Sequence, residues 1–129
     1  MKKIFVLLLV FSAVICAQQK APKITVDKNE FNFGQVEEGQ IVTHDFIVTN
    51  KGGESLEIKG VGASCGCTAA KPEKNVVAGG ESVKINVKFN SEGRRGPQKK
   101  YIYVKSNDPE KAELRLLLTG IVNESAKNK

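Results

Sequence analysis

The feature that most constrains the fold is an alternation of apolar and polar residues between Ser82 and Phe89. The apolar positions are Val83, Ile85, Val87 and Phe89, with polar side chains between them. Successive side chains of a β-strand point to opposite faces, so this pattern predicts a strand with one buried face. Other stretches with the same period and β-prone composition occur at residues 23–27, 31–36, 41–49, 55–61, 99–105 and 114–122.

Turn residues separate these stretches, and no helical period follows residue 22. Short connections favour antiparallel pairing, and residues 71–77, which include Pro72, are predicted to form a loop. The pattern predicts an all-β fold, an immunoglobulin-like antiparallel β-sandwich of seven to eight strands. The chain has no tryptophan and no pair of cysteines at the long spacing of an inter-sheet disulfide, which distinguishes it from antibody-type domains.

The N-terminus has the pattern of a secretory signal peptide. Lys2 and Lys3 precede an apolar run that is too short to span a bilayer comfortably, and Ala17 is a small residue at a plausible cleavage point. We therefore predict a signal peptide at residues 1–17, a linker at 18–22, the sandwich at 23–122 and a polar tail at 123–129. The predicted location is the periplasm, the cell envelope or the extracellular space.

Cys16 offers a second interpretation of the leader. A bacterial lipoprotein is cut just before a cysteine and lipidated on it, but Ile15 departs from the small residue that this machinery prefers. Cleavage after Ala17 discards Cys16, whereas lipidation anchors the protein. A membrane is a predicted partner only in the second case.

The net charge falls from +6 to +4 when Lys2 and Lys3 are removed. Charges of both signs are scattered along the chain, which is typical of a soluble surface, so nucleic acid is not a predicted partner. Arg94 and Arg95, with Lys99 and Lys100, form a basic tip. This tip is either a solvated hairpin end or a contact for an anionic lipid or an anionic surface polymer such as a polysaccharide.

Cys65 and Cys67 are separated by one glycine near the middle of the chain. In an extended strand the two side chains share a face, with Cα atoms about 6.5–7 Å apart. A relaxed disulfide prefers a Cα separation of about 5.5–6 Å, so a bond between them requires a local curl, which Gly66 permits.

Three roles for this pair remain open. The cysteines are structural, or they form a small thiol redox site in an oxidising compartment, or they bind a soft metal such as copper. His44 is the only histidine and the one obvious third ligand, although a lone histidine on an apolar strand face is more often a packing residue. The sequence contains no other catalytic motif, so enzymatic activity is not predicted, and no cofactor is expected apart from the copper alternative.

Together, these features favour a non-enzymatic module that binds other envelope proteins or surfaces. Exposed edge strands provide the route, because they accept a strand from a partner. The oligomeric state and the identity of the partner are not specified by the sequence.

Several short motifs resemble the bacterial exported family known as domain of unknown function 1573. In chain order they are residues 31–34 (FNFG), 46–52 (FIVTNKG), 64–68 (SCGCT), 78–81 (AGGE), 106–109 (SNDP) and 116–120 (LLLTG). Ala78 departs from the proline that the family often has before its glycine turn. The resemblance implies an immunoglobulin-like fold of the Hydin type and an exported location, and it implies no activity.

Overall fold

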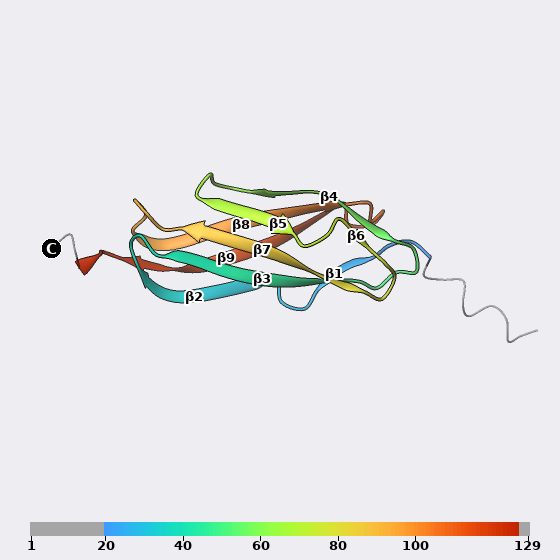
Figure 1. Cartoon of the computed structure of the whole chain (residues 1–129), viewed down its shortest axis with the longest axis horizontal. Helices are drawn as coiled ribbons and strands as arrows, with labels where there is room; N and C mark the ends of the chain where they lie inside the picture. The colour runs from blue at the N-terminus through green and yellow to red at the C-terminus, as the bar shows by residue number, and fades with distance from the viewer. Residues whose placement is uncertain (1–19, 127–129) are drawn as a thin grey trace, which may run out of the picture.

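Two β-sheets lie face to face in the computed structural model, which describes residues 20–126 (Figure 1). The four-stranded sheet has the order β1 (Ile24–Val26), β3 (Ile41–Asn50), β7 (Ser82–Asn90) and β5 (Thr68–Pro72). The five-stranded sheet has the order β2 (Glu30–Glu37), β9 (Glu113–Asn123), β8 (Gly96–Ser106), β4 (Leu56–Ala63) and β6 (Val76–Val77). The predicted all-β sandwich is confirmed.

Two details differ from the sequence prediction. The described residues contain nine strands instead of seven or eight. β6 lies within the predicted loop at residues 71–77, and β5 extends two residues into it. Pro72 is compatible with a strand here because it ends β5 at a sheet edge, where a backbone N–H is not needed by a neighbour. β2 pairs with β9 in parallel, although the other pairs are antiparallel.

The apolar core lies between the sheets. The predicted inward positions of β7 are all buried, and those of β3, β8 and β9 follow the same period of two. Phe46, Phe89, Leu116 and Leu118 are among the fully buried side chains. The alternation that predicted the strands therefore also identifies most of the core.

Asn50 links three segments at one end of the sandwich. Its side chain is completely buried and its Oδ1 accepts hydrogen bonds from the backbone N–H groups of Lys23 and Gly52. Its Nδ2 donates to the carbonyl oxygens of Glu54 and Val77. All four hydrogen-bonding positions of the amide are used, which explains why a polar side chain is tolerated there.

Asp108 has a similar role at the start of β1. Its carboxylate, in a residue that is 4% exposed, accepts hydrogen bonds from the N–H groups of Ile24, Glu110 and Lys111. Desolvation raises the pKa of Asp108, but these three hydrogen bonds and the positive charge of Lys111 together outweigh it and hold the pKa below its ordinary value. The ionised form therefore fixes the N-terminal strand to the loop between β8 and β9.

The predicted signal peptide at residues 1–17, which includes Cys16, lies outside the described residues, as do residues 18 and 19 of the predicted linker. Between residues 20 and 126, no helix has the length and apolar character needed to cross a bilayer.

Candidate functional site

Cys65 and Cys67 lie in the turn that connects β4 of one sheet to β5 of the other. The chain is not extended at this point, because it curls at Gly66 and brings the two Cα atoms to 5.3 Å. The sulfur atoms form a disulfide. A curl at Gly66 is the condition that the short spacing of the two cysteines sets for a disulfide.

Backbone hydrogen bonds hold this turn against the end of β7. The Thr68 N–H donates to the carbonyl oxygen of Cys65, at 3.2 Å, and the Asn90 N–H donates to that of Cys67, at 2.9 Å. Both cysteines are half-buried, and Cys67 packs against the core. The disulfide is therefore partly accessible at one end of the sandwich and is also part of the packing there.

His44 lies on β3 with its ring stacked on Phe31, at a centroid separation of 3.7 Å, and edge-on to Phe46. Its backbone is opposite Val87, whose other neighbour is Ala70 on β5, so two strand spacings, about 10 Å, separate His44 from β5. The structure therefore does not bring His44 together with the cysteines. No cluster of three or more His, Cys, Asp or Glu side chains suited to a metal occurs within residues 20–126.

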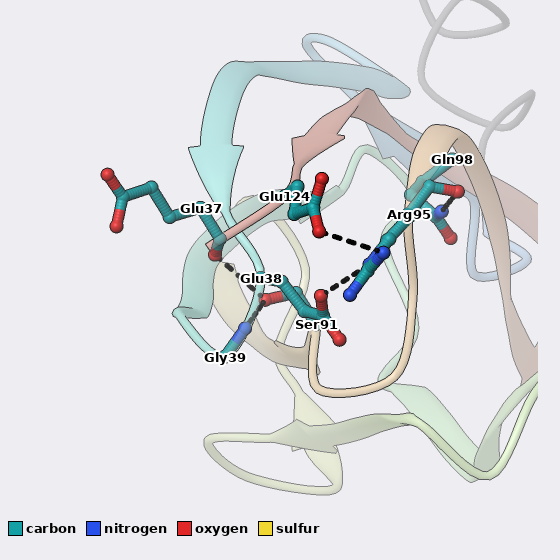
Figure 2. A network of polar contacts seen from close by, with 7 residues as sticks. All are labelled: Glu37, Glu38, Gly39, Ser91, Arg95, Gln98 and Glu124. Atoms are coloured by element: carbon teal, nitrogen blue, oxygen red, sulfur yellow. Dashed lines mark hydrogen bonds and ion pairs between the residues drawn. The ribbon is translucent and has the colours of Figure 1, made fainter. Parts of the chain in front are cut away.

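Part of the positive charge of the basic tip is paired with carboxylates of the same domain. Figure 2 shows Arg95 between two carboxylates, with Nε 2.7 Å from Glu38 and Nη1 3.3 Å from Glu124. Beside this network, the Ser91 hydroxyl lies 2.6 Å from the carbonyl oxygen of Gln40 and accepts a hydrogen bond from the Gly39 N–H.

Two lysines near this tip lie over aromatic rings. The ammonium of Lys100 lies 5.8 Å from the centre of the Phe89 ring, and that of Lys99 lies 5.7 Å from the centre of the Tyr101 ring. Desolvation, followed by the nearby Arg94 guanidinium, lowers the pKa of Lys100. The contacts of Arg95, Lys99 and Lys100 stabilise this end of the sandwich, and they do not form one exposed cluster of unpaired positive charge.

The free edge of β4 was not predicted from the sequence. β6 pairs with β4 only at Leu56 and Glu57. From residue 59 to Ala63, β4 pairs with β8 alone, and no other strand within residues 20–126 pairs with its opposite side. In Figure 1, β4 runs along the upper border of the molecule.

The backbone pattern shows which groups point to this free side. The Ser64 N–H donates to the carbonyl oxygen of Tyr101 on β8. In an antiparallel pair, hydrogen-bonded residues alternate with residues whose N–H and C=O point away. The N–H and C=O groups of Val61 and Ala63 therefore point away from β8, toward the free edge.

The other sheet edges are less suited to accepting a strand from a partner. On β5, the hydrogen bonds of Cys67 and Glu73 to β7 mean that the backbone groups of Thr68, Ala70 and Pro72 point to the free side. However, the Thr68 N–H already donates a hydrogen bond within the turn, and Pro72 has no N–H. The remaining edge strands are short, except β2, whose register is interrupted between Asn32 and Gln35. β4 is therefore the edge best suited to accept another strand.

A shallow depression of about 410 Å³ lies beside this edge on the outer face of the five-stranded sheet. Gly60 and Gly62 leave its floor without side chains, and Tyr103 and Lys105 of β8, with Glu113 of β9, line it. Gly62 is opposite Tyr103, and Gly60 is opposite Lys105. The alternating run of residues 60–63 (GVGA) was the sequence signal that could have identified this edge.

A family model described as "Protein of unknown function (DUF1573)" matches residues 24–122, which confirms the resemblance based on the short motifs. No curated protein matches the chain.

Several solved structures have the same fold. A protein of unknown function from Porphyromonas gingivalis W83 superposes with a TM-score of 0.70 at 18% identity, over 87% of this chain and 51% of that one. This chain therefore spans about half the length of that protein. An ASH/PapD-like domain of human CEP192 gives a TM-score of 0.66 at 13% identity, over 92% and 99% of the two chains. The VesB protease of Vibrio cholerae gives 0.58 at 14% identity, over 80% of this chain and 32% of that one. At these identities the likeness establishes the fold alone.

Proposed function

We propose that this chain, which belongs to the DUF1573 family of proteins of unknown function, is an exported binding module that holds an extended segment of another envelope protein against the free edge of β4. The observation that carries this proposal is the unpaired side of β4 between residue 59 and Ala63. An added strand gains main-chain hydrogen bonds from the outward N–H and C=O groups of Val61 and Ala63. The predicted surface polymer is a different class of partner, for which the contacts of Arg95 provide no support.

Proline substitution at two alanines tests this proposal. Ala63 and Ala70 are both half-buried, and each directs its N–H to the free side of an edge strand, β4 and β5 respectively. Peptides are first selected for binding to the unmodified domain from a random library of 12-residue peptides. Their affinities are then measured for Ala63→Pro and for the matched control Ala70→Pro.

Ala63→Pro removes one outward donor and places a ring on the binding edge, so we expect binding to weaken about tenfold. Ala70→Pro should bind like the unmodified domain. Proline on an edge strand spares the ladder bonds to the neighbouring strand, so both variants should fold. Equal affinity for Ala63→Pro and the unmodified domain, or a loss confined to Ala70→Pro, would contradict strand addition at β4.

The alternative function is thiol–disulfide exchange by Cys65 and Cys67. It is favoured by the position of the disulfide in a half-buried turn at the end of the sandwich. Copper binding by the same pair requires prior reduction, because a cysteine binds a soft metal as the thiolate and not as a disulfide. Equilibration with glutathione buffers tests this alternative. A reduction potential close to that of known oxidoreductases supports it, and a potential below about −300 mV indicates a structural bond.

A further inference from the structure

The residues that line the depression beside β4 indicate which side chains the bound segment contains. On the basis of the proposed function, we propose that the segment has an aromatic residue that packs over Gly62 against Tyr103. We further propose that it has an acidic residue two positions away that pairs with Lys105.

The register of β4 and β8 determines where the two side chains of the bound segment lie. Gly60 and Gly62 point to the outer face of the sheet, and their partners on β8 are Lys105 and Tyr103. In a strand added to the other side of β4, the residues opposite these glycines point to the same outer face. They are two positions apart, and each lies two strand spacings, about 10 Å, from its β8 counterpart.

The glycines leave room for the added side chains. A Cβ atom at either Gly60 or Gly62 would meet no other atom within 4 Å. A large side chain on a neighbouring strand gains contact area by covering a glycine, which is why aromatic residues compensate for glycines in sheets. A side chain across Gly62 is therefore able to lean over β4 and reach the ring of Tyr103.

Other residues hold Tyr103 in place for this contact. Its ring lies near that of Tyr101, with centroids 6.4 Å apart, and 5.7 Å from the guanidinium of Arg115. The same ring lines the depression. An aromatic partner thus meets a surface that is already ordered, which lowers the entropic cost of binding.

The charge of Lys105 is the reason to expect an acidic residue in the bound segment. It is exposed, and within residues 20–126 no carboxylate lies within 4 Å of its ammonium group, although Glu113 is opposite it on β9. A carboxylate across Gly60 is in position to complement this charge. Since β4 runs from Gly60 to Gly62, an antiparallel partner has the order aromatic-x-acidic, and a parallel partner has the reverse.

The experiment uses the library described above, selected in parallel against the unmodified domain and against Gly62→Thr. Threonine suits a strand and fills the space over Gly62. We expect the aromatic and acidic pair to be enriched only with the unmodified domain. For one selected peptide, replacing its aromatic residue by alanine should weaken binding about two- to fivefold to the unmodified domain and have little effect with Gly62→Thr.

A charge exchange tests the acidic position. Lys105→Glu should weaken the binding of the selected peptide, and replacing the acidic residue of the peptide by lysine should restore it. Lys88→Glu, at an exposed position of the other sheet, makes the same change in net charge and should have no effect.

Peptides that lose affinity for Ala63→Pro but lack the aromatic and acidic pair would overturn this inference and leave strand addition intact. Peptides that bind Ala63→Pro normally, or a library that yields no binder, would overturn both.

Discussion

The imidazole ring of His44 lies parallel to the ring of Phe31, with centroids 3.7 Å and planes 7° apart. Phe31 comes from β2 and His44 from β3, so the stack joins the two sheets. Desolvation lowers the pKa of His44 below 6.5, and the carboxylates of Asp45 and Asp27 oppose this only in part. The folded protein therefore favours the neutral imidazole.

We expect stability to fall as the pH decreases from 6.5, the ordinary His value. In this range the unfolded chain binds a proton at His44 more readily than the folded chain does, so protonation favours unfolding. Urea unfolding midpoints between pH 5 and 8 measure the effect. His44→Phe keeps an aromatic ring against Phe31 and removes the titration, so its midpoint should vary less over this range; an unchanged slope would assign the effect to another group.

Asp108→Asn should destabilise the fold by about 2–3 kcal/mol, because three backbone N–H groups lose a charged acceptor and one meets an amide NH₂ instead. The folded pKa of Asp108 is below its ordinary value, so its contribution is present above about pH 3.8 and is lost as the pH falls through the folded pKa. Chemical unfolding at pH 7 and at pH 3 measures both effects. The gap between the two proteins should narrow in acid, and a constant gap would contradict an ionised Asp108.

Gly52→Ala should destabilise strongly, because the added Cβ would overlap the backbone carbonyl of Ala21. Backbone cannot move aside as a flexible side chain can, and Gly52 also donates its N–H to Asn50. Gly60→Ala is the matched control, since its Cβ meets no atom within 4 Å. Thermal unfolding of the two variants should show a large loss for Gly52→Ala and a change within about 1 kcal/mol for Gly60→Ala.

Reduction of the Cys65–Cys67 disulfide should lower stability only modestly. The bond closes a very short loop, for which the chain-entropy relation gives about 1–2 kcal/mol. Melting curves with and without a reductant test this value, with Cys65→Ser/Cys67→Ser as the control that should not respond. Complete unfolding on reduction would mean that the bond is essential to the fold.

The sequence predicted the sandwich well because its strands obey a strict period. Val83, Ile85 and Val87 show the rule, since each is buried where the alternation places it. The cysteine turn was predicted less well, because alternation alone cannot indicate where the chain leaves one sheet for the other. Whether a strand has a neighbour on each side depends on contacts between distant segments. The glycines of residues 60–63 (GVGA) were therefore the one sequence signal at the free side of Val61 and Ala63.

Amide hydrogen exchange at Val61 and Ala63 tests the central claim most directly. In the free domain these two amides should exchange faster than those of Gly60 and Gly62, because only the latter face β8. Adding a library-selected peptide should protect Val61 and Ala63 and leave Ala70 on β5 unchanged. Binding that leaves Val61 and Ala63 at their free exchange rates, or that protects Ala70 instead, would contradict strand addition at β4.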